Sequence, residues 1–410
     1  MKGSQFKIQG FTSNIYSGPL ALNLPLKTKH FANLEPSAPK NPADLFSHLP
    51  LPASGTVAIV VSDKTRLCDY PLCLPLLTFA LMKSGIKKNN IVFFIAYGTH
   101  ARQTDAECLA AYGRTYNTFR FIHHDARDPS GLTTLSKTSF GTDITIRKDI
   151  LDYDHIISFG AILHHYFAGF GGGRKLFFPG LAGYDAILQN HKLFLNFNNR
   201  SLHPLCRSGN LDTNPVALDL EEINHRLPER LEIHAILNTK GKICEIITGK
   251  SYDEFRQACK RYDTFYRSEE AGTFDLVIAS AGGYPKDINL IQSHKAIHNA
   301  ASFVRDGGQL ILFAECRDGI GNSRFPELFR LGGFTGIFDA MEKHYENNGV
   351  TALSLISKTN RICIHMVTSL NPETCSLMNL TKISPGQAQE IINNETGKIA
   401  VIENASMIYR

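Results

Sequence analysis

Continuous apolar runs of strand length limit most strongly how this chain can fold. The run TVAIVVS, from Thr56 to Ser62, shows no polar alternation, which is typical of a strand buried on both faces of a parallel sheet. A helix-length segment from Leu72 to Ser84 follows it, and then come the run NIVFFIA, a helix candidate from Thr104 and the run FRFIHH. Strands that alternate with helices predict an α/β fold built on βαβ units.

The length of 410 residues predicts two domains, because one hydrophobic core rarely serves so long a chain. The apolar run DLVIASAGG, which starts at Asp275, opens a second series of predicted strands and helices. The polar, Gly-containing segment 268–273 before it is the predicted joint. We therefore expect an N-terminal α/β domain over residues 1–270 and a C-terminal α/β domain over residues 271–410, both with mainly parallel sheets.

Composition and the N-terminal segment exclude several classes of protein. Residues 1–54 are rich in Pro and lack periodicity, which predicts an extended arm without regular structure. The N-terminus has no apolar signal region, and the apolar run 71–82 is too short to span a bilayer, so we expect a cytoplasmic protein without membrane contact. A formal net charge of +5 without a basic, aromatic-interleaved stretch suits small anionic substrates and gives no sign of nucleic-acid binding.

The Gly-rich run GFGGGRK, residues 169–175, strongly limits the local backbone conformation. Four Gly in five positions are unfavourable in regular structure, by about 0.5–1 kcal/mol each relative to Ala, so the run predicts a loop that allows close backbone approach. The backbone N–H groups of Gly172 and Gly173 could cradle an anion. Lys175 could pair with a phosphate or bond covalently to a cofactor. A tight turn with a solvated Lys is the plainer alternative.

Polar side chains follow four of the predicted strands. These segments are DKTR (63–66), YGTH (97–100), HHD (123–125) and the pair His164-His165 after a strand at 155–163. Functional residues of a parallel sheet gather beyond the carboxyl ends of its strands, so we expect all four segments at one cleft. Asp63 could also serve only as a helix cap.

These residue types permit acid/base and metal chemistry. Histidine side chains in general gain and lose a proton near neutral pH, so His100 and His165 could alternate as base and acid, as a reversible inversion at a carbon centre requires. Arg66 suits a carboxylate through its planar fork. His191 could bind a borderline metal, but signatures such as HExxH are absent and spacing alone names no metal.

The order of these motifs resembles the nickel-dependent lactate racemase family, from about residue 55 to the end of the chain. The resemblance rests on DKTR (63–66), YGTH (97–100), HHYFAGFGGGRKLFFPGLAG (164–183), NH (190–191), LDTNP (211–215) and QSHK (292–295). Several separate motifs in one order make the resemblance specific.

The resemblance implies a cofactor. In that family a nickel pincer nucleotide, a Ni(II) pyridinium-3,5-bisthiocarboxylate-type mononucleotide, is tethered to the Lys of the Gly-rich loop, and separate maturation enzymes make it. Carried over to this chain, Lys175 would be the tether and His191 the nickel ligand. Asp63, Gly172 and Gly173 would contact the cofactor.

The resemblance also implies how the substrate is held. His100 and His165 would be the acid/base pair, while Arg66, Gln292 and Lys295 would bind the substrate. Gln292 and Lys295 lie in a predicted helix, which places them one turn apart on one face. Because they come from the second α/β domain, the implied active site is an interdomain cleft.

The activity implied is a racemase or epimerase of a 2-hydroxy acid. The Cα–H of such an acid is too weakly acidic for a neutral imidazole, so hydride transfer to the pyridinium, with a His taking the hydroxyl proton, is the implied route. Ile291 stands where the family's type member has a Tyr, so the substrate could carry an apolar or sugar-like tail in place of the methyl group of lactate.

Two other functions stay open at this point. One is an NAD-dependent 2-hydroxy acid dehydrogenase, although no GxGxxG follows the strands at Thr56 or Asp275. The other is a non-catalytic protein that binds a small acid or nucleotide. A binding protein needs charge and shape, but it has no need of two matched proton shuttles.

Overall fold

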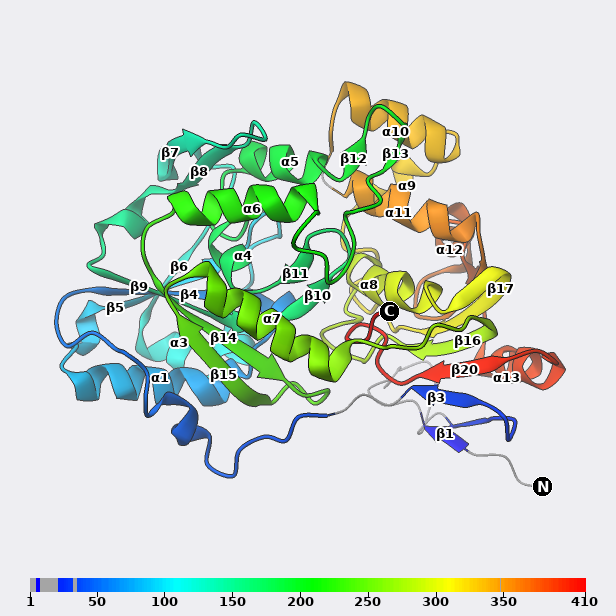
Figure 1. The fold of residues 1–410 in the computed structure, drawn as a ribbon, viewed down its shortest axis with the longest axis horizontal. Helices are drawn as coiled ribbons and strands as arrows, with labels where there is room; N and C mark the ends of the chain where they lie inside the picture. Colours follow the sequence, from blue (N-terminus) through cyan, green and yellow to red (C-terminus); the bar gives the residue numbers. More distant parts are fainter. Residues whose placement is uncertain (1–4, 8–20, 32–34, 347) are drawn as a thin grey trace. The chain divides into compact units, whose positions relative to one another are not determined.

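The computed structural model describes residues 5–7, 21–31, 35–346 and 348–410, which form two compact units (Figure 1). The N-terminal unit comprises residues 35–194 and 204–265. The C-terminal unit comprises residues 195–203 and 266–410 together with the described residues before position 35. Both are α/β, which confirms the predicted fold class. In the described ranges no helix is both long and apolar enough to cross a membrane.

The N-terminal unit is built on a six-stranded sheet in the order β15-β14-β9-β4-β5-β6. Its strands are β4 (Val57–Ser62), β5 (Ile91–Ala96), β6 (Arg120–His123), β9 (His155–Ala161), β14 (Leu231–Leu237) and β15 (Ile243–Gly249). All neighbours are parallel except β14 and β15. The sheet is therefore mainly parallel, as predicted.

Helices and short 3-10 turns connect these strands. The helices are α1 (Tyr70–Ser84), α2 (Asp105–Tyr112), α3 (Thr115–Thr118), α4 (Arg174–Phe177), α5 (Tyr184–Lys192), α6 (Pro215–Arg226) and α7 (Tyr252–Tyr266). The 3-10 turns are η1 (Pro42–Phe46), η2 (Lys64–Arg66), η3 (Lys88–Asn90), η4 (Pro129–Gly131) and η5 (Lys148–Asp152).

Strand β4 is buried on both faces, as its continuous apolar run predicted. Val57, Ile59 and Val61 join the core that contains the buried residues of α1. The opposite face of the sheet is covered in part by α4, where Leu176 lies so close to Gly160 of β9 that a Cβ there would be 2.7 Å from its Cδ1 atom. Close packing against both faces is what a parallel sheet requires.

The position of β4 determines where a ligand site can form. In the strand order β4 lies between β5 and β9. The chain first forms β5 next to one edge of β4 and later forms β9 next to its other edge. Because the strand order reverses at β4, the connections after β4 and after β9 run in opposite directions. This leaves a crevice at the carboxyl ends of these strands, which is the usual ligand site of open α/β sheets.

The C-terminal unit contains a second six-stranded sheet, in the order β19-β18-β17-β16-β20-β3, with every pair parallel. Its strands are β3 (Lys29–Phe31), β16 (Phe274–Ser280), β17 (Val304–Phe313), β18 (Cys363–Val367), β19 (Thr381–Lys382) and β20 (Ile399–Ile402). Its helices are α8 (Leu290–Ala301), α9 (Phe325–Leu328), α10 (Gly333–Lys343), α11 (Gly349–Thr359), α12 (Pro372–Leu377) and α13 (Pro385–Asn394).

The prediction of an irregular arm over residues 1–54 is wrong at three short strands and the turn η1, while residues 24–28, 35–41 and 47–54 have no helix or strand, and part of the prediction lies outside the described residues. β1 (Gln5–Lys7) pairs with β2 (Ala21–Asn23), and β3 pairs with β20, which places this segment in the C-terminal unit. Strands of three residues are too short to show a period of two. Phe31 is buried against Phe274 and Phe303, and this contact fixes β3.

The Gly-rich run also differs in part from its prediction as a loop. Gly169–Gly171 form strand β11, which pairs with β10 (Leu163–His165) as an antiparallel hairpin. The backbone of Gly169 approaches that of Asn210 so closely that a Cβ would lie 2.4 Å from its carbonyl oxygen. Only the glycines that follow form the predicted turn.

Two further strand pairs complete the described structure. β7 (Leu132–Lys137) and β8 (Asp143–Arg147) form an antiparallel hairpin in the N-terminal unit. β12 (Leu195–Asn196) and β13 (Ser201–Leu202) form a two-stranded pair that belongs to the C-terminal unit.

Candidate active site

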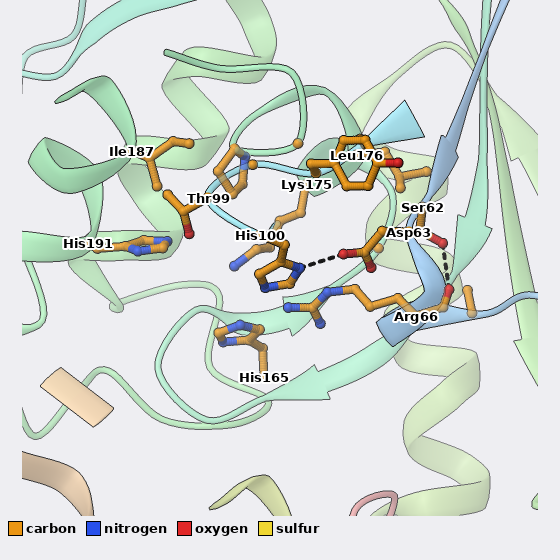
Figure 2. Close-up of a pocket in the computed structure, with 17 residues that line it drawn as sticks. Ser62, Asp63, Arg66, Thr99, His100, His165, Lys175, Leu176, Ile187 and His191 are labelled. Carbon is orange, nitrogen blue, oxygen red and sulfur yellow. Dashed lines mark hydrogen bonds and ion pairs between the residues drawn. The ribbon is translucent and has the colours of Figure 1, made fainter. Parts of the chain in front are cut away.

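A pocket in the N-terminal unit lies at the carboxyl ends of β4, β5 and β9, where the topology predicts a crevice (Figure 2). It is lined by seven of the residues that the sequence singled out, namely Asp63, Arg66, His100, His165, Gly172, Lys175 and His191. Figure 2 shows the side chains of Arg66, His100, His165, Lys175 and His191 converging on one space. The pocket therefore gathers cationic and imidazole groups at the predicted edge of the sheet.

Buried Asp63 pairs with the exposed side chain of His100 in the pocket. The carboxylate of Asp63 is 3% exposed, and its Oδ2 atom lies 2.6 Å from Nδ1 of His100. Its Oδ1 atom accepts hydrogen bonds from the backbone N–H and the hydroxyl of Thr65, at 3.1 and 2.7 Å, which caps η2. The capping role considered for Asp63 is thus confirmed, while its contact with a cofactor stays a prediction.

The charge of Asp63 determines the proton position on its partner. Burial alone would raise the pKa of this carboxyl, but His100 and the Thr65 hydrogen bonds hold the pKa below its usual value. An ionised carboxylate accepts the Nδ1–H of His100. In the neutral ring, Nε2 of His100 is then the atom that can accept a proton.

The two adjacent His of β10 point to opposite faces of the strand, because side chains alternate along a strand. His165 lines the pocket, while His164 turns the other way and its Nε2 atom lies 2.6 Å from Oδ1 of Asp263. Nδ1 of His165 accepts a long hydrogen bond, at 3.4 Å, from the backbone N–H of Ala168. His165, and not His164, is therefore the second imidazole of the pocket.

The turn after β11 requires glycine and holds Lys175 in place. Gly172 has φ +81° and a Cβ there would lie 2.0 Å from the carbonyl oxygen of Ala161, while Gly173 has φ +49° and packs against Phe255. Backbone N–H groups of Lys175 and the next residue donate to Gly172 and Gly173 at 2.9 Å each. No side chain fits this turn, which starts α4 below the pocket.

Arg174 and Lys175 point to opposite sides of this turn. Arg174 is 1% exposed and its guanidinium lies over the rings of Tyr252 and Phe255, at 5.2 and 4.9 Å from their centroids. Lys175 lines the pocket, with Nζ 5.3 Å from the ring centroid of Phe167. A buried Arg therefore anchors the residue next to the pocket lysine.

His191 is placed near the end of α5 and suits a metal ligand. Its Nε2 atom is buried and has no hydrogen-bond partner in the part of the chain that the structure describes. Burial, followed by the charges of Lys175 and Arg66, lowers the pKa of His191 to about 3. A neutral imidazole with an unused nitrogen lone pair is the form that binds metals.

The segment HHD (123–125), which was expected at the same cleft, does not reach the pocket, so this part of the prediction is wrong. β6 is the edge strand of the sheet, and its last residue, His123, packs against Tyr97, with its Nδ1 atom 2.8 Å from the phenol oxygen. His124 is buried beside Ala182, with Nε2 2.9 Å from its carbonyl oxygen, and burial lowers its pKa to about 4. Both His are structural, because an edge strand ends outside the crevice.

Gln292 and Lys295 lie on α8 of the C-terminal unit. The amine of Lys295 donates to Oε1 of Gln292 at 2.6 Å, which confirms that both share one helix face. Asn289 caps the helix by accepting from the backbone N–H of Gln292 at 2.9 Å. Ile291, the departure from the family pattern, is partly exposed beside them. Their contact with a substrate stays a prediction.

Apolar side chains of the pocket were not identified from the sequence. Leu176, Pro179 and Ile187 line it together with the functional groups. The segment LFFPG directly after Lys175 carried this signal, since apolar residues that follow a functional loop often form the wall of its pocket. Within the described ranges no three His, Cys, Asp or Glu side chains are placed to hold a metal ion. A metal bound to His191 would need donors from elsewhere.

Comparison with known proteins agrees with this architecture. Residues 42–202 match the family described as the lactate racemase N-terminal domain, and residues 269–352 match the lactate racemase C-terminal domain. Lactate racemases of Thermoanaerobacterium thermosaccharolyticum and Lactiplantibacillus plantarum are each 31% identical, over 276 and 271 residues, which are 67% and 66% of this chain. The chain spans 63% and 62% of the length of these two relatives.

Solved structures extend the likeness to the whole chain. The lactate racemase apoprotein of T. thermosaccharolyticum superposes with a TM-score of 0.81 and 26% identity, covering 99% of this chain and 100% of that one. A Thermotoga maritima protein shares the fold, with a TM-score of 0.71, 16% identity and coverage of 93% and 100%.

Fold and pocket together define an α/β protein with a basic, imidazole-lined site at the switch point of a parallel sheet. The chain belongs to the lactate racemase family.

Proposed function

We propose that this protein is a racemase or epimerase of a 2-hydroxy acid that works with a nickel pincer nucleotide tethered to Lys175. The observation that carries the proposal is one pocket that contains two imidazoles, His100 and His165, together with Lys175 and the metal-competent His191. Inversion at a carbon centre needs one group that accepts a proton and one that donates it.

The residues of the pocket fit the proposed cofactor. His191 offers a buried neutral nitrogen, and the described residues contain no group of three His, Cys, Asp or Glu placed to hold a metal, so the sulfur donors of a pincer nucleotide would complete the coordination. Lys175 follows a turn that only glycine can form, which fixes its backbone. Arg66 adds a positive charge to the same pocket for an anionic group.

The chain's own residues would divide the chemistry as follows. When bound, the cofactor supplies a ring that accepts hydride from the α-carbon and returns it. His100 takes the hydroxyl proton at Nε2, and the resulting imidazolium is stabilised by the carboxylate of Asp63. For the opposite enantiomer, His165 takes this role. Arg66 orients the substrate carboxylate.

The test is a racemisation screen of protein co-produced with the cofactor-making enzymes. Single enantiomers of 2-hydroxy acids with tails of increasing size and polarity would be followed by chiral chromatography, and we expect loss of enantiomeric excess with nickel and without NAD. Activity that requires NAD and no nickel would indicate a dehydrogenase. A fully loaded protein that moves no isotope label at Cα of any acid would be a binding protein.

Substitution of Lys295 tests the substrate role proposed for α8. We expect Lys295→Ala to raise KM and lower kcat together, reducing kcat/KM by about 10–100-fold, because a charged hydrogen bond contributes about 1.5–3 kcal/mol. Steady-state kinetics with the true substrate measures this, with cofactor content unchanged by intact mass. Lys343→Ala, at the last turn of α10, is the control and should behave as wild type. Wild-type kinetics of Lys295→Ala would remove α8 from the site.

A further inference from the structure

We propose that Asp219 is a positioning residue that, through Asn190, holds the proposed nickel ligand His191 in place. The inference rests on the proposed function, since it assigns a purpose to a buried network beside that ligand. Asp219 lies on α6 and is fully buried. It lines no part of the pocket, so its role cannot be direct contact with substrate or cofactor.

Asp219 is surrounded by hydrogen-bond donors. Its Oδ1 atom accepts from the hydroxyl of Thr138 at 2.6 Å, and its Oδ2 atom accepts from the hydroxyl of Thr142 at 2.7 Å and from Nδ2 of Asn190 at 2.8 Å. Among the described residues no cation forms an ion pair with it. A buried carboxylate with three donors and no counter-charge is costly unless its geometry serves a purpose.

Asn190 connects this network to the pocket. It is fully buried, it directly precedes His191 on α5, and its amide also donates to the backbone carbonyl of Val216 at 3.4 Å. Gln189, the residue before it, exchanges hydrogen bonds with Asp143 of β8, at 2.7 and 3.0 Å. Both residues that precede His191 are therefore fixed from outside the pocket, and the ligand follows them.

The β7–β8 hairpin supplies the other half of the network. Thr138 and Thr142 close its tip, with the backbone N–H of Thr138 donating to the carbonyl of Thr142 at 2.9 Å. Ser139 of the same tip donates its N–H and hydroxyl to Glu222 of α6. The hairpin tip thus joins α6 to α5 around Asp219, so it limits the movement of the last turn of α5.

The chemistry of the pair explains why one partner is an acid and the other an amide. Asp219 must accept from three donors, which a carboxylate does with both oxygens and an amide cannot do. Asn190→Asp would place two buried carboxylates against each other. Adding Asp219→Asn to that variant restores one acid and one amide in reversed positions at this contact, since the Thr142 hydroxyl can turn to accept, and it loses only the long 3.4 Å hydrogen bond to the carbonyl of Val216.

The experiment compares Asn190→Asp, Asp219→Asn and the double variant in cofactor-loaded protein. Groups that orient a metal ligand commonly change metal affinity by about 10–100-fold, so we expect nickel to leave Asn190→Asp at least about tenfold faster than wild type. Asp219→Asn should lose it about threefold to tenfold faster, and the double variant should return to within about threefold of wild type. The mass of the Lys175 adduct should not change.

A second readout uses the apoprotein and needs no cofactor. Histidine-selective ¹⁵N labelling, with the His191 signal assigned by its loss in His191→Gln, should show one set of ring signals in wild type. We expect split or broadened signals in the single variants and recovery in the double variant. Leu77→Ala, which opens a cavity in the core around α1, controls for lost stability alone and should leave the His191 signal single.

The outcomes separate the two proposals. Wild-type protein without adduct or nickel would refute the proposed cofactor, and the apoprotein signals would still decide whether Asp219 positions His191. If Asn190→Asp does not fold, nickel loss and the His191 ring signal are both measured in Asp219→Asn alone. Wild-type nickel retention and a single His191 signal in Asp219→Asn, or no recovery in a folded double variant, would overturn the role of Asp219.

Discussion

Lys175→Ala is expected to abolish both a covalent adduct of nucleotide size and racemase activity. The reason is local geometry, because the Gly172-Gly173 turn fixes the backbone of Lys175 while its side chain lines the pocket with His191. A tethered cofactor has a high effective concentration at the site, and losing it should lower the rate by about 10⁴-fold or more. Intact-mass analysis of loaded protein and a racemisation assay measure the two effects.

Matched variants make this result specific. Lys192→Ala, at the last residue of α5, should keep the adduct and its activity. His191→Ala should keep the adduct but hold nickel poorly, because the tether and the metal ligand are different residues. An adduct that persists in Lys175→Ala would place the tether elsewhere, and protein produced without the maturation enzymes should carry no adduct in any variant.

The parts of the fold that came from long apolar patterns could be predicted from the sequence. The run at β4 is buried on both faces, and its place in a parallel sheet follows from the helices that alternate with strands. β3 and the β7–β8 hairpin could not be predicted in this way. β3 is three residues long and buries only Phe31, and β7 reads LTTLSK with no buried position. In the hairpin only β8, which reads DITIR and buries Ile144 and Ile146, has an alternating apolar face.

Site residues could be predicted from the sequence where they belong to a short motif at the end of a strand. Contacts between residues far apart in the sequence could not be predicted. The strand period could have shown that only one of His164 and His165 faces the pocket, but not which one. The contact between Asp63 and His100 joins residues 37 apart, and it depends on the turn after β5 as well as on strand order. The link between Asp219 and Asn190 needs a hairpin that the pattern did not show.

The second large effect is expected for Asp63→Asn, which should lower kcat by about 10²–10⁴-fold with cofactor content unchanged. The amide can present its NH₂ group to Nδ1 of His100, which then accepts, so the ring proton moves to Nε2 and the base is lost for the substrate hydroxyl. The amide also cannot stabilise the imidazolium that forms after proton transfer. Both effects act on the chemical step, so KM should change little.

The chain offers a control for the capping role of Asp63. Asp128 caps another 3-10 turn, η4, by accepting from the N–H and hydroxyl of Ser130 at 3.0 and 2.6 Å, but it pairs with no His among the residues that the structure describes. Asp128→Asn should therefore show what the loss of such a cap costs, and we expect kcat within about twofold of wild type, because exposed surface substitutions change stability by about 0.5 kcal/mol or less.

Cofactor content distinguishes the two roles considered for Asp63. If Asp63 orients His100, as its 2.6 Å contact indicates, Asp63→Asn keeps the Lys175 adduct and its nickel while turnover falls. If Asp63 mainly contacts the cofactor, as the family resemblance implies, the adduct or the metal is lost in proportion to the activity. Full activity with full cofactor content would show that His100 needs no partner at Nδ1, and the proton-transfer role proposed for this pair would then have to be given up.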